Sequence, residues 1–363
     1  MQDTKISKLE EYLFDFGKGN RERKVLLGLV RSLLRSRSCQ IHKLAELFNP
    51  EVLSCSNARR IRRYLDKNSI DEGQYVRWVL SQFVEDWQKI ILSMDRTESK
   101  VGHEKMNVLC IGLSYDVGAI PLVWMSLEKN GPSYTHQRIA LLERLLGHLS
   151  AKQRDQIWYL CADREFLGID WLNWLDEQQL LYVIRVRQDI TLSYKGVKQR
   201  VSKFFEQKSY KCLKGQGLIY EKMHYVAGYR QKKAQGKKRA RYFILLSNAP
   251  LQHGKIWYFE RWNIEVLFGH LKSKGFGLTD CRMRQGKRVE SLLQVMSLAY
   301  CWLTQWREKL RKARANNRLK RLKAKRGTKI WLYSWFRVAL DLLAGQIARK
   351  HPFNLDLFQF VRY

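Results

Sequence analysis

Apolar residues near the start of the chain recur at helical spacing. In residues 22–36, leucine and valine return every three or four positions, and residues 40–48 and 57–66 repeat the pattern. This spacing places the apolar side chains along one face of a helix, where they can pack against a neighbour. The sequence therefore predicts a small helical domain over residues 1–85.

The pattern changes at about residue 87. Short, continuous apolar runs predict strands at 89–95, 106–116 and 119–128. Further strands at 157–163, 180–187 and 242–248 alternate with amphipathic helical segments, which cover 135–150 and 169–179. Antiparallel-looking strands followed by alternating strands and helices predict a mixed α/β sheet with flanking helices. We expect this core to span residues 86–187 and 240–305.

Two segments depart from the α/β pattern. Residues 188–239 are polar and lysine-rich, with short alternating pieces that predict an inserted β unit and a loop at 230–241. Residues 306–363 are basic and rich in tryptophan, and we expect a helical C-terminal region there. Its run of lysine and arginine over 307–329 is either a disordered phosphate-binding tether or a basic helix.

The charge of the chain is strongly positive. Its 67 Lys and Arg outnumber 34 Asp and Glu, which leaves a net charge of +33 and a pI near 10.0. Such a surface attracts polyanions, above all nucleic acid. No apolar run reaches the 18 residues that indicate a membrane span, so we expect no membrane partner. Seven scattered cysteines without a CxxC pair favour reduced thiols in a cytoplasm.

Arginines crowd the third N-terminal helical segment, residues 57–66. They are Arg59, Arg60, Arg62 and Arg63. Three short helices that end in a basic one are typical of a helix-turn-helix-like DNA-binding unit. A solvated amphipathic helix in a small bundle would show the same pattern, and the sequence leaves both interpretations open.

Two predicted strands end in an aspartate. Asp95 closes the strand 89–95 and Asp163 closes the strand 157–163. Taken singly, each is more typical of a turn or a helix cap. If the two strands are neighbours, however, both carboxylates lie at the sheet edge where open α/β folds bind ligands.

Residues 257–275 predict a helix with an unusual polar row. At about 100° per residue, Tyr258, Arg261, Glu265 and Lys272 fall within an arc of roughly 60°. The row spans about 21 Å, which suits the repeated phosphates of a nucleic-acid backbone better than a small molecule. Glu265 would be a third carboxylate beside the aspartates, and carboxylates are ligands that Mg²⁺ prefers. A surface ion pair between Glu265 and Arg261 is the simpler alternative.

The spacing of this row resembles the YREK signature of the insertion-sequence-four family of DDE transposases. Asp95 in "SMDRTES" and Asp163 in "CADREF" resemble the two aspartates of that family. The resemblance implies a ribonuclease-H-like core interrupted by a β insertion before the glutamate helix. Arg164 and Glu165, which follow Asp163, either orient the site from behind or form a salt bridge with each other.

The resemblance also implies an activity. A cut-and-paste transposase binds terminal inverted repeats and catalyses Mg²⁺-dependent strand cleavage and strand transfer. Two Mg²⁺ ions, for which Mn²⁺ can substitute, would be held by Asp95, Asp163 and Glu265. The implied partners are double-stranded DNA, both transposon ends and target, and a second copy of the chain on that DNA. The implied location is the bacterial cytoplasm, in association with the nucleoid.

The remaining members of the row have an implied role on DNA. Tyr258, Arg261 and Lys272 would hold phosphates near the cleaved end. A relative with a hairpin intermediate stacks its flipped base on a tryptophan of the insertion, and residues 188–256 contain none. The aromatic residues that could replace it are Tyr225, Tyr229, Tyr242 and Phe243.

Two other functions are compatible with much of this pattern. A structure-specific nuclease on the same core would keep the carboxylates but would have less use for the Tyr-Arg-Lys row. A domesticated, non-transposing DNA-binding protein would need only the positive charge. It would gain nothing from three clustered anions, so intact Asp95, Asp163 and Glu265 argue against it.

Overall fold

The computed structural model describes residues 7–13, 16–17, 19–67, 70–101, 104–115, 118–128, 130–231, 241–281, 283, 285–305, 321–323, 329–331, 336–337 and 339–341. The chain divides into two compact units. One comprises Met1–Tyr75, Glu98–Met106 and Phe268–Tyr363, and the other comprises Val76–Thr97 and Asn107–Leu267. The first is called the helical unit below and the second the sheet unit.

The helical unit contains the predicted N-terminal helices. They are α1 (Ser7–Leu13), α2 (Asn20–Ser36), α3 (Ile41–Phe48) and α4 (Ser54–Lys67), and α2 and α4 pack against α11 (Gly286–Gln305). The leucines and valines of α2 that recur at helical spacing are buried, as expected from the pattern. Between Leu278 and Asp280 a short 3₁₀ helix, η2, precedes α11.

One side chain holds the connection between α3 and α4. The buried amide of Asn57 donates hydrogen bonds to the carbonyls of Ala45, Asn49 and Val52 at 3.0, 2.8 and 3.2 Å. Carbonyls at the end of a helix lack hydrogen-bond donors within that helix, and the Asn57 amide supplies the missing donor. This buried side chain therefore ties the end of α3 and the following turn to α4.

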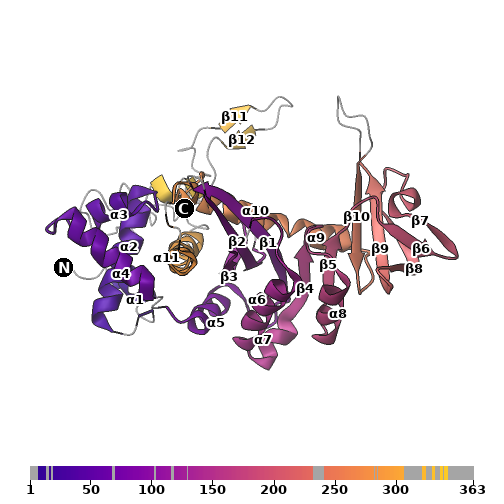
Figure 1. The fold of residues 1–363 in the computed structure, drawn as a ribbon, viewed down its shortest axis with the longest axis horizontal. Helices are drawn as coiled ribbons and strands as arrows, with labels where there is room; N and C mark the ends of the chain where they lie inside the picture. The colour runs from indigo at the N-terminus through magenta and orange to yellow at the C-terminus, as the bar shows by residue number, and fades with distance from the viewer. Residues whose placement is uncertain are drawn as a thin grey trace, which may run out of the picture. The chain divides into compact units, whose positions relative to one another are not determined.

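The sheet has ten strands in the order β3-β2-β1-β4-β5-β10-β9-β8-β6-β7 (Figure 1). The core strands are β1 (Ile90–Val101), β2 (Glu104–Leu113), β3 (Ile120–Ser126), β4 (Ile157–Ala162), β5 (Tyr182–Arg185) and β10 (Tyr242–Ser247). β1, β4 and β5 run parallel, whereas β3 is antiparallel to β2 and β10 to β5. The mixed α/β sheet that the pattern predicts is confirmed.

The predicted β insertion continues this sheet. It consists of β6 (Thr191–Tyr194), β7 (Val197–Arg200), a 3₁₀ turn η1 (Val201–Phe204), β8 (Lys211–Ile219) and β9 (Lys222–Arg230). β9 pairs antiparallel with β10 over six residues, Tyr225 to Arg230. Most of the loop expected at 230–241 lies outside the described residues.

Helices cover the core strands. They are α5 (Glu72–Phe83), α6 (Thr135–Gly147), α7 (Ala151–Gln156), α8 (Ile169–Glu177), α9 (Gly254–Phe259) and α10 (Trp262–Leu271). α6 packs against β3 and α8, and α9 packs against β4 and β5. No helix in the described part of the chain is long and apolar enough to span a bilayer.

The C-terminal region differs from expectation where it is described. Arg321–Lys323 (β11) and Lys329–Trp331 (β12) pair as antiparallel strands, although the charge run predicted a tether or a basic helix. Of the expected helical C-terminal region, residues 336–337 and 339–341 are helical. The rest of residues 306–363 lies outside the described part of the chain.

Candidate active site

The register of β1 and β4 brings the two aspartates together. The parallel ladder between these strands ends at the pair Met94 and Ala162. Asp95 is the next residue of β1, and Asp163 directly follows the last residue of β4. β1 does not stop at Asp95 as predicted, because Thr97 and Ser99 stay buried and the strand runs on to Val101. Asp95 is instead the point at which β1 leaves β4. The neighbouring strands that the sequence could only suggest are present.

The predicted helix 257–275 is interrupted next to the site. α9 ends at Phe259 and α10 begins at Trp262. Across the break the amides bond three residues back, as in Arg261 N–H to Tyr258 O at 3.0 Å. The carbonyl of Glu260 is drawn toward the sheet, where it accepts hydrogen bonds from Ser93 and Ser114. The row therefore does not lie on one straight helix.

Arg261, at this break, joins two of the three carboxylates. Its Nη1 lies 3.1 Å from Asp95 Oδ2, and its Nη2 lies 2.5 Å from Glu265 Oε1. Tyr258 reaches the third carboxylate and donates its hydroxyl to Asp163 Oδ1 at 3.2 Å. The guanidinium also stacks over the Tyr258 ring at 5.5 Å. The ion pair between Glu265 and Arg261 exists, but it is one part of a larger cluster.

The cluster is largely buried and short of positive charge. The Arg261 side chain is 7% exposed and that of Asp95 17%. Burial raises the pKa of Asp95 to about 6, although Arg261 opposes the shift. Burial alone would lower the pKa of Arg261, but Tyr258 and the nearby carboxylates raise it above its ordinary value. Arg261 thus pairs with two of the three carboxylates, Asp95 and Glu265, and in the described part of the chain its Nε is buried without a partner.

The chain matches a known protein-family model. The family model described as "Transposase DDE domain" matches residues 87–302, more than half of the chain. The chain belongs to the DDE transposase family. No curated protein matches it. The mixed sheet with flanking helices is accordingly a ribonuclease-H-like fold, and the family indicates an enzyme that acts on DNA.

The donor chemistry of the DDE cluster suits divalent metal ions. Carboxylate oxygens are hard ligands, and one oxygen each of Asp163 and Glu265 forms no hydrogen bond among the described residues. No group of three His, Cys, Asp or Glu side chains in the described part of the chain is gathered tightly enough to hold an ion. The guanidinium of Arg261 lies between Asp95 and Glu265. The residues fit the ions in chemistry, and Arg261 would have to withdraw for them to converge.

Lys272, the last member of the row, follows α10. Its Nζ donates a hydrogen bond of 2.7 Å to the carbonyl of Glu98, in the part of β1 beyond Asp95. Both residues belong to the helical unit.

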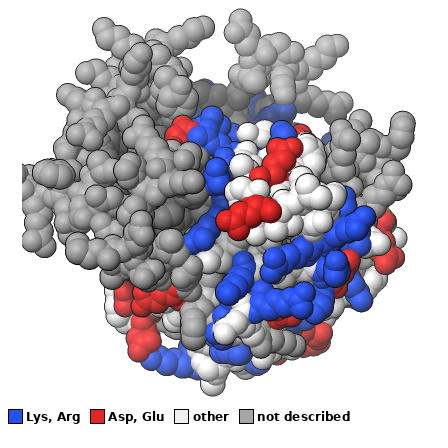
Figure 2. Space-filling model, turned by 90° about the vertical axis from the view of Figure 1, so that its left-hand side faces the viewer, with Lys and Arg blue, Asp and Glu red and all other residues white. Residues whose placement is uncertain are grey.

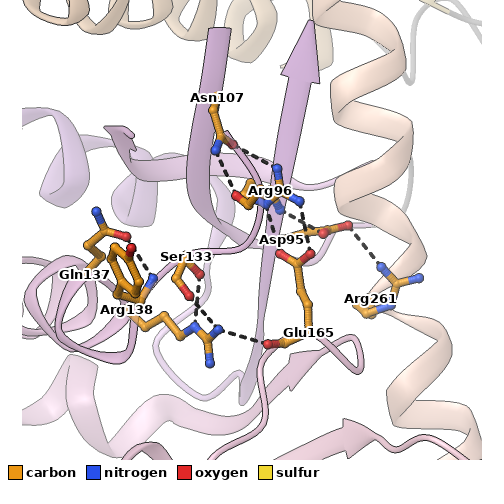
Figure 3. Close-up of polar contacts among 10 residues, drawn as sticks. Asp95, Arg96, Asn107, Ser133, Gln137, Arg138, Glu165 and Arg261 are labelled. Carbon is orange, nitrogen blue, oxygen red and sulfur yellow. Dashed lines mark hydrogen bonds and ion pairs between the residues drawn. The ribbon is translucent and has the colours of Figure 1, made fainter. Parts of the chain in front are cut away.

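Sequence reasoning missed a layer of polar residues behind the aspartates of the DDE domain. Glu165 does not pair with Arg164, which is exposed, but with Arg96, the residue after Asp95 (Figure 3). Arg96 also bonds to Asn107, and the buried Arg138 bonds to the carbonyl of Glu165. These partners are 11 to 69 residues from one another in the sequence, and no local pattern marks them.

Exposed aromatic residues lie next to the DDE cluster. Trp262 is 59% exposed and Phe259 51%, and they flank the break that carries Arg261. Of the four aromatic residues considered as replacements, Phe243 lies in the core strand β10 and is buried beneath Phe259, with ring centroids 5.9 Å apart. Trp262 lies just beyond residues 188–256, the segment that contains no tryptophan.

The arginines of α4 form a basic surface on the helical unit. Arg59, Arg62 and Arg63 are exposed, whereas Arg60 is half-buried over the ring of Phe48 at 5.8 Å. Figure 2 views the side on which α2, α3 and α4 lie in Figure 1 and shows wide areas of Lys and Arg. The exposed arginines are available for phosphates, and Arg60 contributes to packing.

Proposed function

We propose that this chain is a cut-and-paste DNA transposase of an insertion sequence. It binds terminal inverted repeats and catalyses Mg²⁺-dependent strand cleavage and strand transfer. The observation that carries the proposal is the meeting of Asp95 and Asp163 at the ends of a parallel ladder, with Glu265 tied to Asp95 through Arg261. Such a cluster of acidic side chains costs stability unless it serves cations.

Asp95, Asp163 and Glu265 would hold two Mg²⁺ or Mn²⁺ ions. When bound, these ions activate a water or a 3′ hydroxyl for attack on a DNA phosphate and stabilise the charge that develops. This role is supported by the place of Asp95 at the end of the β1–β4 ladder and by the hydrogen bond that Asp163 accepts from Tyr258. Glu265 is 36% exposed, so its carboxylate can turn toward an incoming ligand.

Arg261 acts as the internal counter-ion of the cluster in the free protein. On binding DNA it would exchange the carboxylates for a phosphate, to which a guanidinium can offer two parallel hydrogen bonds. Tyr258 would hold a phosphate beside the cluster, and Lys272 would contact a phosphate of the same DNA. Glu165 keeps its place behind the aspartates through Arg96, and the exposed Arg164 would face the substrate side.

The partners follow from the same proposal. The exposed arginines of α4, with Arg60 at their side, would engage the double-stranded transposon ends through a helix-turn-helix-like unit. Target DNA would be joined at the DDE cluster. Because two ends must be cut together, the active form would be a homodimer on DNA, in the bacterial cytoplasm with the nucleoid.

Phe259 and Trp262 add a surface for unpaired nucleotides beside the cluster. Exposed aromatic rings next to cations are a common means of binding unstacked bases. The cation Lys255 lies 5.8 Å from the ring of Phe259. A hairpin intermediate is therefore compatible with the site although the insertion lacks tryptophan.

An excision assay tests the proposed function. A plasmid that carries the coding sequence with its flanking DNA is incubated with purified full-length protein and Mg²⁺, and the products are sized on a denaturing gel. We expect paired cuts at both ends of the element and none with scrambled flanks. Cuts that ignore the flanks would indicate a nuclease, and binding without any cuts would indicate a domesticated DNA-binding protein.

A further inference from the structure

Arg96 connects the two strands that carry the catalytic aspartates. Its Nε lies 3.2 Å from Glu165 Oε1 and its Nη2 lies 3.3 Å from Glu165 Oε2, so the pair is bidentate. The backbone amide of Arg96 donates to Asp95 Oδ1 at 2.8 Å. One residue thus contacts the carboxylate of Asp95 through its backbone and the Asp163 segment through its side chain.

The segment on the other side is a tight turn. The amide of Phe166 donates to the carbonyl of Asp163 at 2.9 Å, which places Glu165 inside a turn that begins at Asp163. Arg138 holds the turn from below, because its Nη2 donates to the carbonyls of Glu165 and Ser133 at 2.9 and 2.7 Å. Its guanidinium also lies over the ring of Phe166. The turn is therefore held at Glu165 in two ways: Arg138 binds the backbone carbonyl, and Arg96 binds the carboxylate.

Arg96 is itself held in orientation. Its Nη1 donates to Asn107 Oδ1 at 3.0 Å, and Asn107 in turn donates to the carbonyl of Gly131 at 3.0 Å. The Arg96 side chain is 13% exposed, which keeps water from competing strongly for its hydrogen bonds. Figure 3 shows the resulting chain from Asn107 through Arg96 to Glu165 and Arg138.

We infer that Arg96 and Glu165 are positioning residues that act as one unit and set the separation of the Asp95 and Asp163 carboxylates. This inference rests on the proposed function, because that separation matters only if the two aspartates share ions. The pair performs two tasks. Its fork of hydrogen bonds fixes the distance between the strand β1 and the Asp163 turn, and its cation neutralises a fourth carboxylate that lies close to Asp95.

The geometry explains why these two tasks need a bidentate arginine. A carboxylate beside Asp95 that lacked its cation would repel Asp95 and would compete for divalent ions. A lysine would neutralise the charge but would make a point contact, which leaves the Asp163 turn free to rotate. Outer partners of metal ligands typically change metal affinity or activity about 10- to 100-fold when removed.

The test compares Arg96→Gln, Glu165→Gln, the double variant and Arg96→Lys in the full chain. Mn²⁺ binding without DNA is measured by calorimetry, the Mn²⁺ dependence of plasmid cleavage is measured in parallel, and thermal unfolding reports folding. We expect each single Gln variant to weaken Mn²⁺ binding and cleavage about tenfold or more. The double variant should be no worse than either single one, because both lose the same unit. Arg96→Lys should fall between wild type and Arg96→Gln.

Arg187→Gln is the matched control, because Arg187 forms a bidentate pair with Asp189 of similar geometry that is exposed. It should leave Mn²⁺ binding unchanged. Hydrogen exchange of the peptide that contains Phe166 serves as a readout independent of metal, and it should accelerate in the Arg96 and Glu165 variants and not in the control.

The outcomes separate the inference from the proposed function. Variants that fold and bind Mn²⁺ as the wild type does would overturn the inference. Opposite changes of the Mn²⁺ affinity in Arg96→Gln and Glu165→Gln would also overturn it, because the change in net charge near the aspartates would then explain both results. A wild-type chain that neither binds Mn²⁺ nor cuts DNA would instead defeat the proposed function, and the inference with it.

Discussion

Two polar clusters of the sheet unit differ in how completely their hydrogen bonds are formed. At the root of the insertion, Lys222 forms an ion pair with Asp176 and donates to Asn173 Oδ1 and to the carbonyl of Leu172. Asn248 donates to the other oxygen of Asp176 and to the carbonyl of Leu180, and it accepts from the amide of Tyr182. Each of these polar groups has a partner.

The DDE cluster lacks that completeness. Arg261 pairs with Asp95 and Glu265, and its Nε is buried without a partner. Among the described residues, Asp163 and Glu265 each keep an oxygen that forms no hydrogen bond. A satisfied cluster stabilises one conformation, whereas an unsatisfied one is retained where a ligand completes it. The difference supports a structural role for the root of the insertion and the proposed ligand-binding role for the DDE cluster.

We expect the largest effect on the DDE cluster from Glu265→Gln. We expect this variant to lose more than about a hundredfold in DNA cleavage, beyond the range of outer-layer partners, because a direct metal ligand is removed. Binding to end DNA should persist, since no cation is lost. Cleavage is followed on denaturing gels and binding by mobility shift, with the exposed Glu177→Gln as control. Normal cleavage by Glu265→Gln would exclude Glu265 as a ligand.

Arg261→Gln tests the role of the cation in the DDE cluster. Removal of the internal counter-ion should lower cleavage about tenfold or more, because a phosphate loses its bidentate partner. Mn²⁺ binding without DNA should become tighter, since Asp95 and Glu265 lose their competing cation. Calorimetry measures the affinity, and the exposed Arg200→Gln is the control. Weaker Mn²⁺ binding would show that Arg261 helps to form the ion site and does not compete with the ion for the carboxylates.

The buried His224, which lies near Lys222 but outside the satisfied cluster, should respond in pH rather than in catalysis. Burial, with the help of Lys222 and against Asp176, lowers the pKa of His224 to about 4, and the buried imidazole contacts the Tyr182 hydroxyl at 3.3 Å. The unfolded chain gains this proton near pH 6.5, and the folded chain gains it only near pH 4. The free energy of unfolding should therefore fall as the pH is lowered from 6.5 to 4, by at most on the order of 3 kcal/mol.

A substitution at His224 tests whether this residue causes the loss of stability between pH 6.5 and 4. His224→Gln, which cannot titrate, should flatten the pH dependence of the free energy of unfolding between pH 6.5 and 4, as measured with urea. A curve parallel to that of the wild type would assign the effect to other groups.

The smallest expected effect is that of Lys222→Met. The change leaves Asp176 without its cation and should lower the free energy of unfolding by about 1–3 kcal/mol, because the pair is only partly exposed. Cleavage by the folded protein should be unchanged. The exposed pair of Lys203 and Glu206 provides the control, and Lys203→Met should cost about 0.5 kcal/mol or less. A large loss of cleavage in Lys222→Met would undo the distinction between the clusters.

Much of the site could be predicted because its signals are local. Asp95 and Asp163 follow apolar runs, and the intervals among Tyr258, Arg261, Glu265 and Lys272 are readable in the chain. Their alignment on one helix was wrong, since the carbonyl of Glu260 bonds to Ser93 and Ser114 and breaks the helix before Arg261. The break depends on residues more than a hundred positions away, which no helical period contains.

The sequence by itself determined which segments become buried strands and amphipathic helices, where the acidic residues fall on them, and the positive charge that favours DNA. Periodicity and composition decide these features, because burial of apolar faces dominates local choice. Only the tertiary structure decided that β1 and β4 are neighbours, that the insertion extends the same sheet, and that Arg96 pairs with Glu165. Those contacts join distant residues by geometry and charge, and their partners become known only when the chain has folded.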